Sequence, residues 1–150
     1  MTTTVPPSLL TSGPAFSAYR ATDQTGMSSA TWTKVQLNTE TFDTAGAFDN
    51  ATNYRFAPLV SGYYQINGSV QSAGASSVVA LGAAIYKNGT AVATSYAPIA
   101  GSSVMAVSAV VFLNGSTDYV ELWGHINGTG ALSFTGGAGV TQMSGVLIQA

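Results

Sequence analysis

Few residues of this chain have side chains suited to acid–base or nucleophilic chemistry. His125 is the only histidine among the 150 residues, and cysteine is absent. A serine hydrolase or a general acid–base mechanism would need His125. It lies in a predicted strand, Trp123–Asn127, with no Gly-x-Ser-x-Gly motif around it. One histidine without cysteine also makes a zinc site implausible. We therefore expect His125 to be a structural or surface residue, and we predict no catalytic residue.

The carboxylates give a similar result. Asp43 and Asp49 flank one loop, and a glycosidase needs two converging carboxylates. With 6 acidic residues in the chain, some will lie near each other by chance, and Asp49 suits the stabilisation of a turn. No Asp-rich loop resembles a dedicated calcium site. We expect no enzymatic activity, no cofactor and no metal.

Aromatic residues are the best candidates for binding. Tryptophan and tyrosine suit both stacking against sugars and anchoring a protein contact. The candidates are Trp32, Tyr63, Tyr96, Tyr119 and Trp123, and among them we predict ligand contact at Trp32, Tyr63 and Tyr96. The alternative is that rings such as Trp32, Tyr119 and Trp123 fill the core or a subunit interface.

Composition excludes several classes of partner. Hydrophobic residues make up 46% of the chain, enough for a sizeable core, and only 7% of residues are charged. The net charge is −2 and the four basic residues are scattered, so neither nucleic acid nor an anionic membrane is expected as a partner. The first residues lack the pattern of a signal peptide, and no segment approaches the ~20 apolar residues of a membrane span. We expect the protein to stay in the cytoplasm, or to leave the cell within something assembled there, without membrane insertion.

The elements that position these residues are short strands. Residues 1–13 are typical of an extended arm, because Pro6-Pro7 favours polyproline geometry, and residues 14–150 form one domain. The pattern predicts an all-β, two-sheet antiparallel jelly-roll sandwich of ten strands. We place them near 15–22, 31–37, 39–43, 53–57, 62–72, 77–87, 91–96, 103–113, 118–126 and 140–149.

Asn-Gly pairs mark the turns. Asn88-Gly89, Asn114-Gly115 and Asn127-Gly128 each follow an apolar run, and Asn-Gly suits the positive φ angles of a two-residue hairpin. Asn67-Gly68 falls inside a predicted strand, where we expect a β-bulge.

Two predicted strands, 78–86 and 104–113, are apolar on both faces. A sandwich has a single interior, so the second apolar faces need another cover. The simplest cover is another copy of the chain, and the alternative is a loop over a central strand. We predict a trimer interface formed by Val79, Leu81, Ala83, Ile85, Met105, Val107, Ala109, Val111 and Leu113.

One stretch resembles a known family. The pattern Phe…Asp…Tyr-x-Phe-x-Pro-x-x-x-Gly-x-Tyr-x-Ile over residues 48–66 closely resembles the signature of the complement C1q / tumour necrosis factor jelly-roll family. Residues 15–20, 85–89, 118–122 and 144–148 resemble further strands of that family in the same order. The signature and core positions are Phe48, Tyr54, Phe56, Pro58, Gly62, Tyr64, Ile66 and Gly145.

The resemblance implies a homotrimer that binds something without a chemical step. Low charge, no cysteine and no collagen-like stalk are more similar to the versions found in bacteriophage particles. These imply a virion-surface protein, either a capsid decoration or head fibre, or a tail-fibre tip that binds a host glycan or protein. A soluble cytokine-like or lectin-like ligand is a further alternative. Some members of the family hold calcium near the trimer axis, so the resemblance leaves open whether this protein binds calcium there.

The arm fits the decoration hypothesis, because a short apolar segment could dock onto a capsid or fibre base. The docking residues would be Val5, Pro6, Pro7, Leu9 and Leu10. A simple disordered terminus is the alternative.

Overall fold

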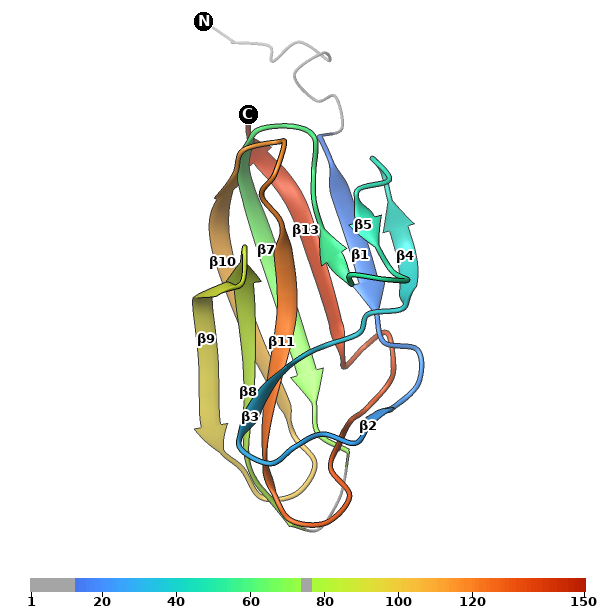
Figure 1. Cartoon of the computed structure of the whole chain (residues 1–150), viewed down its shortest axis with the longest axis vertical. Helices are drawn as coiled ribbons and strands as arrows, with labels where there is room; N and C mark the ends of the chain where they lie inside the picture. The colour runs from blue at the N-terminus through green and yellow to red at the C-terminus, as the bar shows by residue number, and fades with distance from the viewer. Residues whose placement is uncertain (1–12, 74–76) are drawn as a thin grey trace, which may run out of the picture.

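The computed structural model describes residues 13–73 and 77–150, and every regular element in these ranges is a β-strand. One sheet has five antiparallel strands. Their order across the sheet is β10 (Val104–Leu113), β7 (Gly62–Gln71), β13 (Gln142–Gln149), β1 (Ala15–Tyr19) and β4 (Thr39–Asp43). Figure 1 shows this sheet packed face to face against a second one.

The second sheet has six strands. Its order is β5 (Phe48–Asp49), β6 (Arg55–Phe56), β11 (Val120–Gly128), β8 (Val78–Lys87) and β9 (Thr90–Pro98). The sixth strand, β3 (Thr31–Lys34), also pairs with β11, further along that strand than β6 does. A small ladder joins β12 (Ser133–Phe134) to β2 (Gln24–Thr25). The predicted two-sheet sandwich is confirmed, and each of the ten predicted strands has a counterpart. The two-residue strands β2, β5 and β12 were not predicted, because so short a run shows no periodicity.

The core lies between the two sheets and follows the period of two that a strand imposes. Along β7, alternate residues are buried, and Tyr64, Ile66 and Val70 point inward. Phe16 of β1 stacks on Phe56 of β6, with ring centroids 4.2 Å apart, and thereby joins the two sheets.

The signature residues gather around this stack. Phe48 lies 5.1 Å from Phe16 and Tyr64 lies edge-on to Phe56 at 5.6 Å, while Pro58, Gly62 and Gly145 are also buried. Tyr54 differs from the prediction. It precedes β6 with a φ of 52° and is half-buried, so it ends a turn and does not alternate with Phe56 along a strand.

Asp49 organises that turn. Its carboxylate accepts hydrogen bonds from the backbone N–H groups of Ala51, Thr52 and Asn53 and from the Asn53 side chain. The backbone N–H groups of Thr52 and Ala51, followed by the Asn53 amide, lower the pKa of Asp49 to about 2. The turn-stabilising function expected for Asp49 is confirmed.

The Asn-Gly pairs behave in different ways. Asn88-Gly89 joins β8 to β9 with φ angles of 50° and 80°, as the hairpin prediction requires. Asn127-Gly128 is not a hairpin turn, because it lies in β11, where the pairing to β8 shifts register. The bulge expected at Asn67-Gly68 is wrong, because β7 pairs with β10 there without a shift. A side chain at Gly68 would instead meet Leu122.

Gly145→Ala is expected to destabilise the fold by about 1–3 kcal/mol through overpacking. A Cβ atom at Gly145 would come within 2.6 Å of Phe16 and 2.7 Å of Ile66, next to the stack that joins the sheets. Gly139→Ala is the control, because a Cβ atom there meets no atom within 4 Å. Urea unfolding followed by fluorescence measures both variants. Equal free energies of unfolding would contradict the tight packing at Gly145.

Candidate functional site

The outer face of the five-stranded sheet carries exposed apolar side chains. Alternation along β10, β7 and β13 turns one set of residues inward and leaves the other set on the surface. We call the exposed apolar members of this surface set at one end of the sheet the apolar face: Tyr63, Val110, Phe112, Val146 and Ile148. Phe112 and Tyr63 are paired across the strands and meet edge-on at 5.3 Å. A patch of this kind is typical of a protein contact surface.

Further along the same face the surface turns polar. A shallow depression is lined by the side chains of Asn67, Ser69, Gln142 and Ser144 and by the backbone at Gly68. The five-stranded sheet thus has an apolar half and a polar half on its outer side.

The predicted trimer interface is wrong in most of its residues, because it named the inner faces of β8 and β10. Six of its members are buried between the two sheets of one protomer, and Met105 and Ala109 pack against the core. The six are Leu81, Ala83, Ile85, Val107, Val111 and Leu113. Val79 alone is exposed, at 55%. The six buried residues cannot reach a second copy without opening the sandwich.

The second apolar face of β8 has an intramolecular cover, which the sequence did not reveal. Cross-strand pairing places Tyr96 of β9, Gly82 of β8, His125 of β11 and Trp32 of β3 in one row on the outer side of the six-stranded sheet. The His125 ring lies 5.2 Å from Trp32 and 5.1 Å from Tyr96. β8 therefore needs no neighbouring copy to cover this side.

A second row reinforces the first. Trp123 pairs with Ala84 and stacks on the Tyr86 ring at 4.6 Å with an interplanar angle of 20°. Ala84 beside them is fully buried. We call the five rings of both rows the aromatic face: Trp32, Tyr86, Tyr96, Trp123 and His125.

Charges on the aromatic face are paired. Glu121 is buried, and its carboxylate forms an ion pair with the Lys34 ammonium at 2.6 Å. The carboxylate also accepts a hydrogen bond from Trp123 Nε1. Burial lowers the pKa of His125 below its usual value, although the Ala30 carbonyl acts in the opposite direction, so the imidazole is neutral at pH 7. The local surface is therefore close to electrically neutral.

The three predicted ligand-contact residues separate into two groups. Trp32 and Tyr96 come together on the aromatic face, on either side of His125. Tyr63 lies on the apolar face of the other sheet. The prediction did not include Tyr86, Trp123 or His125 as contact residues. Their types were visible in the sequence, but their grouping depends on strand register.

Most carboxylates have structural partners. Asp43 accepts hydrogen bonds from the backbone of Ala45 and Phe48, and Asp49 holds the turn described above.

No group of three histidine, cysteine, aspartate or glutamate residues that could hold a metal occurs in ranges 13–73 and 77–150. No helix suited to crossing a membrane is found in the same part of the chain.

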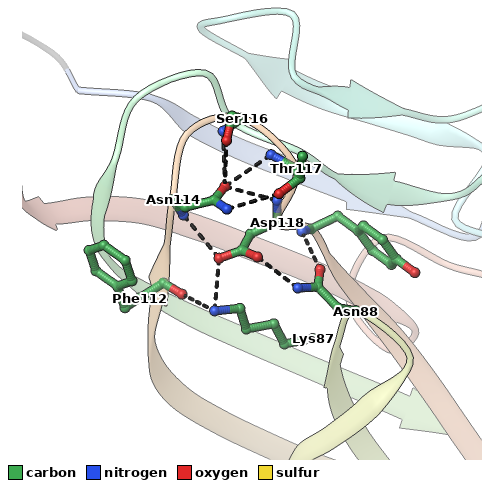
Figure 2. A network of polar contacts seen from close by, with 8 residues as sticks. Lys87, Asn88, Phe112, Asn114, Ser116, Thr117 and Asp118 are labelled. Atoms are coloured by element: carbon green, nitrogen blue, oxygen red, sulfur yellow. Dashed lines mark hydrogen bonds and ion pairs between the residues drawn. The ribbon is translucent and has the colours of Figure 1, made fainter.

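Asp118 is the centre of a polar network that ties two turns together (Figure 2). Its carboxylate contacts the Lys87 ammonium at 2.8 Å, the Asn88 amide at 2.7 Å and the backbone N–H of Asn114 at 3.0 Å. Lys87 also donates to the Phe112 carbonyl, and Asn114 Oδ1 accepts from the backbone of Ser116, Thr117 and Asp118. The polar groups of this network pair with one another, which indicates that the network holds the β8–β9 and β10–β11 turns together. We call it the Asp118 clasp.

The predicted docking residues Val5, Pro6, Pro7, Leu9 and Leu10 lie outside the described residues. The arm and its function stay a prediction.

Comparisons with known proteins identify the fold. No protein-family model and no curated protein sequence matches the chain. Murine APRIL at pH 5.0 superposes with a TM-score of 0.68 at 9% identity, over 91% of this chain and 99% of that chain. An Eiger TNF from S. frugiperda gives 0.67 at 9% identity over 91% and 93%. The globular domain of zebrafish complement 1qA gives 0.57 at 18% identity over 90% and 97%.

These likenesses establish a C1q/TNF-like jelly roll, as the signature of residues 48–66 predicted. At such low identities they describe the fold and carry no statement about activity or partners.

Asp118→Asn is expected to lower the free energy of unfolding at pH 7. The hydrogen bond from Lys87, followed by the bond from Asn88, lowers the pKa of Asp118. Its stabilising contribution is therefore complete above the unfolded pKa of about 3.9 and is lost as the pH falls through the lower folded pKa. Urea unfolding of the unmodified protein and of Asp118→Asn should show a difference in the free energy of unfolding at pH 7 that becomes smaller near pH 2.

Glu40→Gln is the control of opposite sign. Partial burial, followed by repulsion from Asp43, raises the pKa of Glu40, so removal of its charge should leave stability at pH 7 unchanged or increased. A loss at pH 7 that is equal for both variants would contradict a specific function of the Asp118 clasp.

Proposed function

We propose that this protein is a non-enzymatic, homotrimeric C1q/TNF-like module on the surface of a bacteriophage particle, as a capsid decoration or head fibre. The proposal that the chain forms a trimer is supported by the apolar face on the outer side of the five-stranded sheet. Exposed valine, isoleucine and aromatic side chains form a patch there that the described part of the chain leaves uncovered.

A second surface complements this patch. β9 and β10 are the edge strands of the two sheets and lie against each other along one side of the sandwich, with Ser95 Oγ contacting Met105 Sδ between them. Met105, Ala109 and Ala93 are only partly buried along this seam. When the edge of one copy packs on the face of the next, the contact is heterologous, and it forms a ring where the rotation between copies closes. Three copies are what the resemblance to the C1q/TNF family implies.

The virion part rests on composition and resemblance. Only 7% of residues are charged and cysteine is absent, so the surface depends little on ionic strength or redox conditions. A particle protein must persist without repair, and a closed trimer supplies the buried area for that. The alternative placement is a tail-fibre tip that binds a host glycan or protein.

A soluble cytokine-like ligand is the second candidate, favoured by a different observation. Two of the structural neighbours, APRIL and Eiger TNF, belong to the tumour necrosis factor type, and the likeness spans nearly their whole chains. The fold alone is equally consistent with this candidate and with a particle protein.

Val110→Asp is expected to convert the trimer into folded monomers. Val110 is 57% exposed on the apolar face, so a charge there is harmless to the monomer, while its burial in an interface costs several kcal/mol by order of magnitude. Light scattering should give three times 15.2 kDa for the unmodified protein and 15.2 kDa for the variant.

Val79→Asp is the matched control. Val79 is 55% exposed, but it lies on β8 of the other sheet. We expect this variant to remain trimeric. Dissociation by Val79→Asp with retention of the trimer by Val110→Asp would overturn the assignment of the apolar face, and a monomeric unmodified protein would overturn the trimer.

Immunolabelling of purified phage particles tests the location. Antibody against residues 15–150 should label the capsid head in electron micrographs. Label confined to the tail would favour the receptor-binding alternative. Unlabelled particles would contradict a virion function and favour the soluble ligand.

A further inference from the structure

The aromatic face lies on the outer side of the six-stranded sheet, on the opposite side of the sandwich from the apolar face. Both tryptophans of the chain belong to it, although the core between the sheets is filled by other residues. An outer sheet face of this fold class normally becomes polar, because nothing in the sandwich requires it to be apolar. The rings cover the outer side of β8, but part of their own surface stays exposed, and that exposure calls for a further explanation.

Gly82 shows how closely the rings approach the sheet. A Cβ atom at this position would lie 2.8 Å from Trp32 Cη2 and 3.1 Å from Tyr96 Cδ2. The missing side chain thus lets the two rings approach each other over the backbone of β8. Tyr96 is 52% exposed and Trp32 is half-buried, so the pair presents ring surface to solvent.

His125 gives a second, independent observation. The residue is only 8% exposed, and its Nδ1 atom is buried without a hydrogen-bond partner among the described residues. An unpaired buried polar atom is unfavourable and uncommon in native proteins. The imidazole ring itself lies between the rings of Trp32 and Tyr96. Because the atom has almost no accessible surface, a hydroxyl group of a bound molecule reaches it only when a neighbouring side chain moves.

The chemistry of the surroundings selects the occupant. The ion pair of Lys34 with Glu121 leaves no net charge beside the rings, which disfavours anionic and cationic ligands alike. Hydroxyl and amide groups of Thr94 and Asn127 occupy the same outer side of β9 and β11. Pyranose rings have an apolar C–H face and a rim of hydroxyl groups, which suits flat aromatic side chains with neutral polar neighbours.

We propose that the aromatic face binds a neutral oligosaccharide, with one pyranose ring stacked on Trp32 and Tyr96. The exposed aliphatic residues that suit a protein partner, Val110, Val146 and Ile148, gather on the opposite face. This inference does not depend on the trimer or on the virion, because every residue that it uses belongs to one protomer.

The test is a titration of the full chain with neutral oligosaccharides built from glucose, galactose or mannose, followed by calorimetry and by the NMR signals of the two indole N–H groups. At least one neutral sugar should bind and shift the Trp32 signal. Tyr96→Ala should weaken that binding by about tenfold or more, the effect of losing one aromatic contact. Trp32→Ala should have the same effect.

Tyr63→Ala is the matched control, because Tyr63 is 47% exposed but lies on the apolar face. It should leave sugar binding unchanged. Light scattering and thermal unfolding of each variant separate loss of binding from loss of assembly or fold. Tyr96→Ala removes a largely exposed ring, so it tests the site even where Trp32→Ala unfolds.

Several outcomes would overturn the proposal. One is that no neutral sugar binds at a concentration of about 10 mM, because a dissociation constant above that value is weaker than specific recognition. Another is that only sialylated or sulfated glycans bind. A third is that Tyr96→Ala and Tyr63→Ala weaken sugar binding equally. Dissociation of the trimer by Tyr96→Ala would instead assign the aromatic face to a contact between copies.

Discussion

The packing of the two sheets on one another, centred on the stack of Phe16 on Phe56, determines which side of each strand faces inward. Phe16 belongs to the five-stranded sheet and Phe56 to the six-stranded sheet, and their rings meet at a centroid distance of 4.2 Å, with Phe48 and Tyr64 around them. Gly145 leaves the room that Phe16 occupies. Because side chains alternate along a strand, the choice of inner face at this stack also fixes the outer faces. Both candidate surfaces are consequences of that choice.

Strand positions could be predicted from sequence where one face is polar. β7 is the clearest case, because Tyr64, Ile66 and Val70 alternate with Gln65, Asn67 and Ser69. The prediction of faces failed on β8 and β10, because both strands are apolar on both sides and periodicity alone cannot choose between Val107 and Val110. The structure resolves the choice through contacts between sheets, which are distant in sequence. For β8, the second apolar face is covered by rings from β3, β9 and β11.

The aromatic face illustrates the same limit for a site. Trp32 and Tyr96 were recognisable by residue type, but they are brought together by a row of pairs across four strands. A shift of one residue in any of these ladders would turn one ring into the core. His125 looked unremarkable in sequence because it lacks catalytic partners, and its unpaired Nδ1 becomes visible only when the rings around it are placed.

The two outer faces also account for the unusual composition. A sandwich that leaves both outer faces to solvent would carry charged residues on them, whereas only 7% of this chain is charged. An aliphatic patch on one sheet and an aromatic patch on the other remove much of the area where charges would lie. If the apolar face turns toward neighbouring copies, the aromatic face necessarily turns outward, because the thickness of the sandwich separates them. Assembly and recognition can then act on the same protomer without competing for surface, since each uses its own sheet.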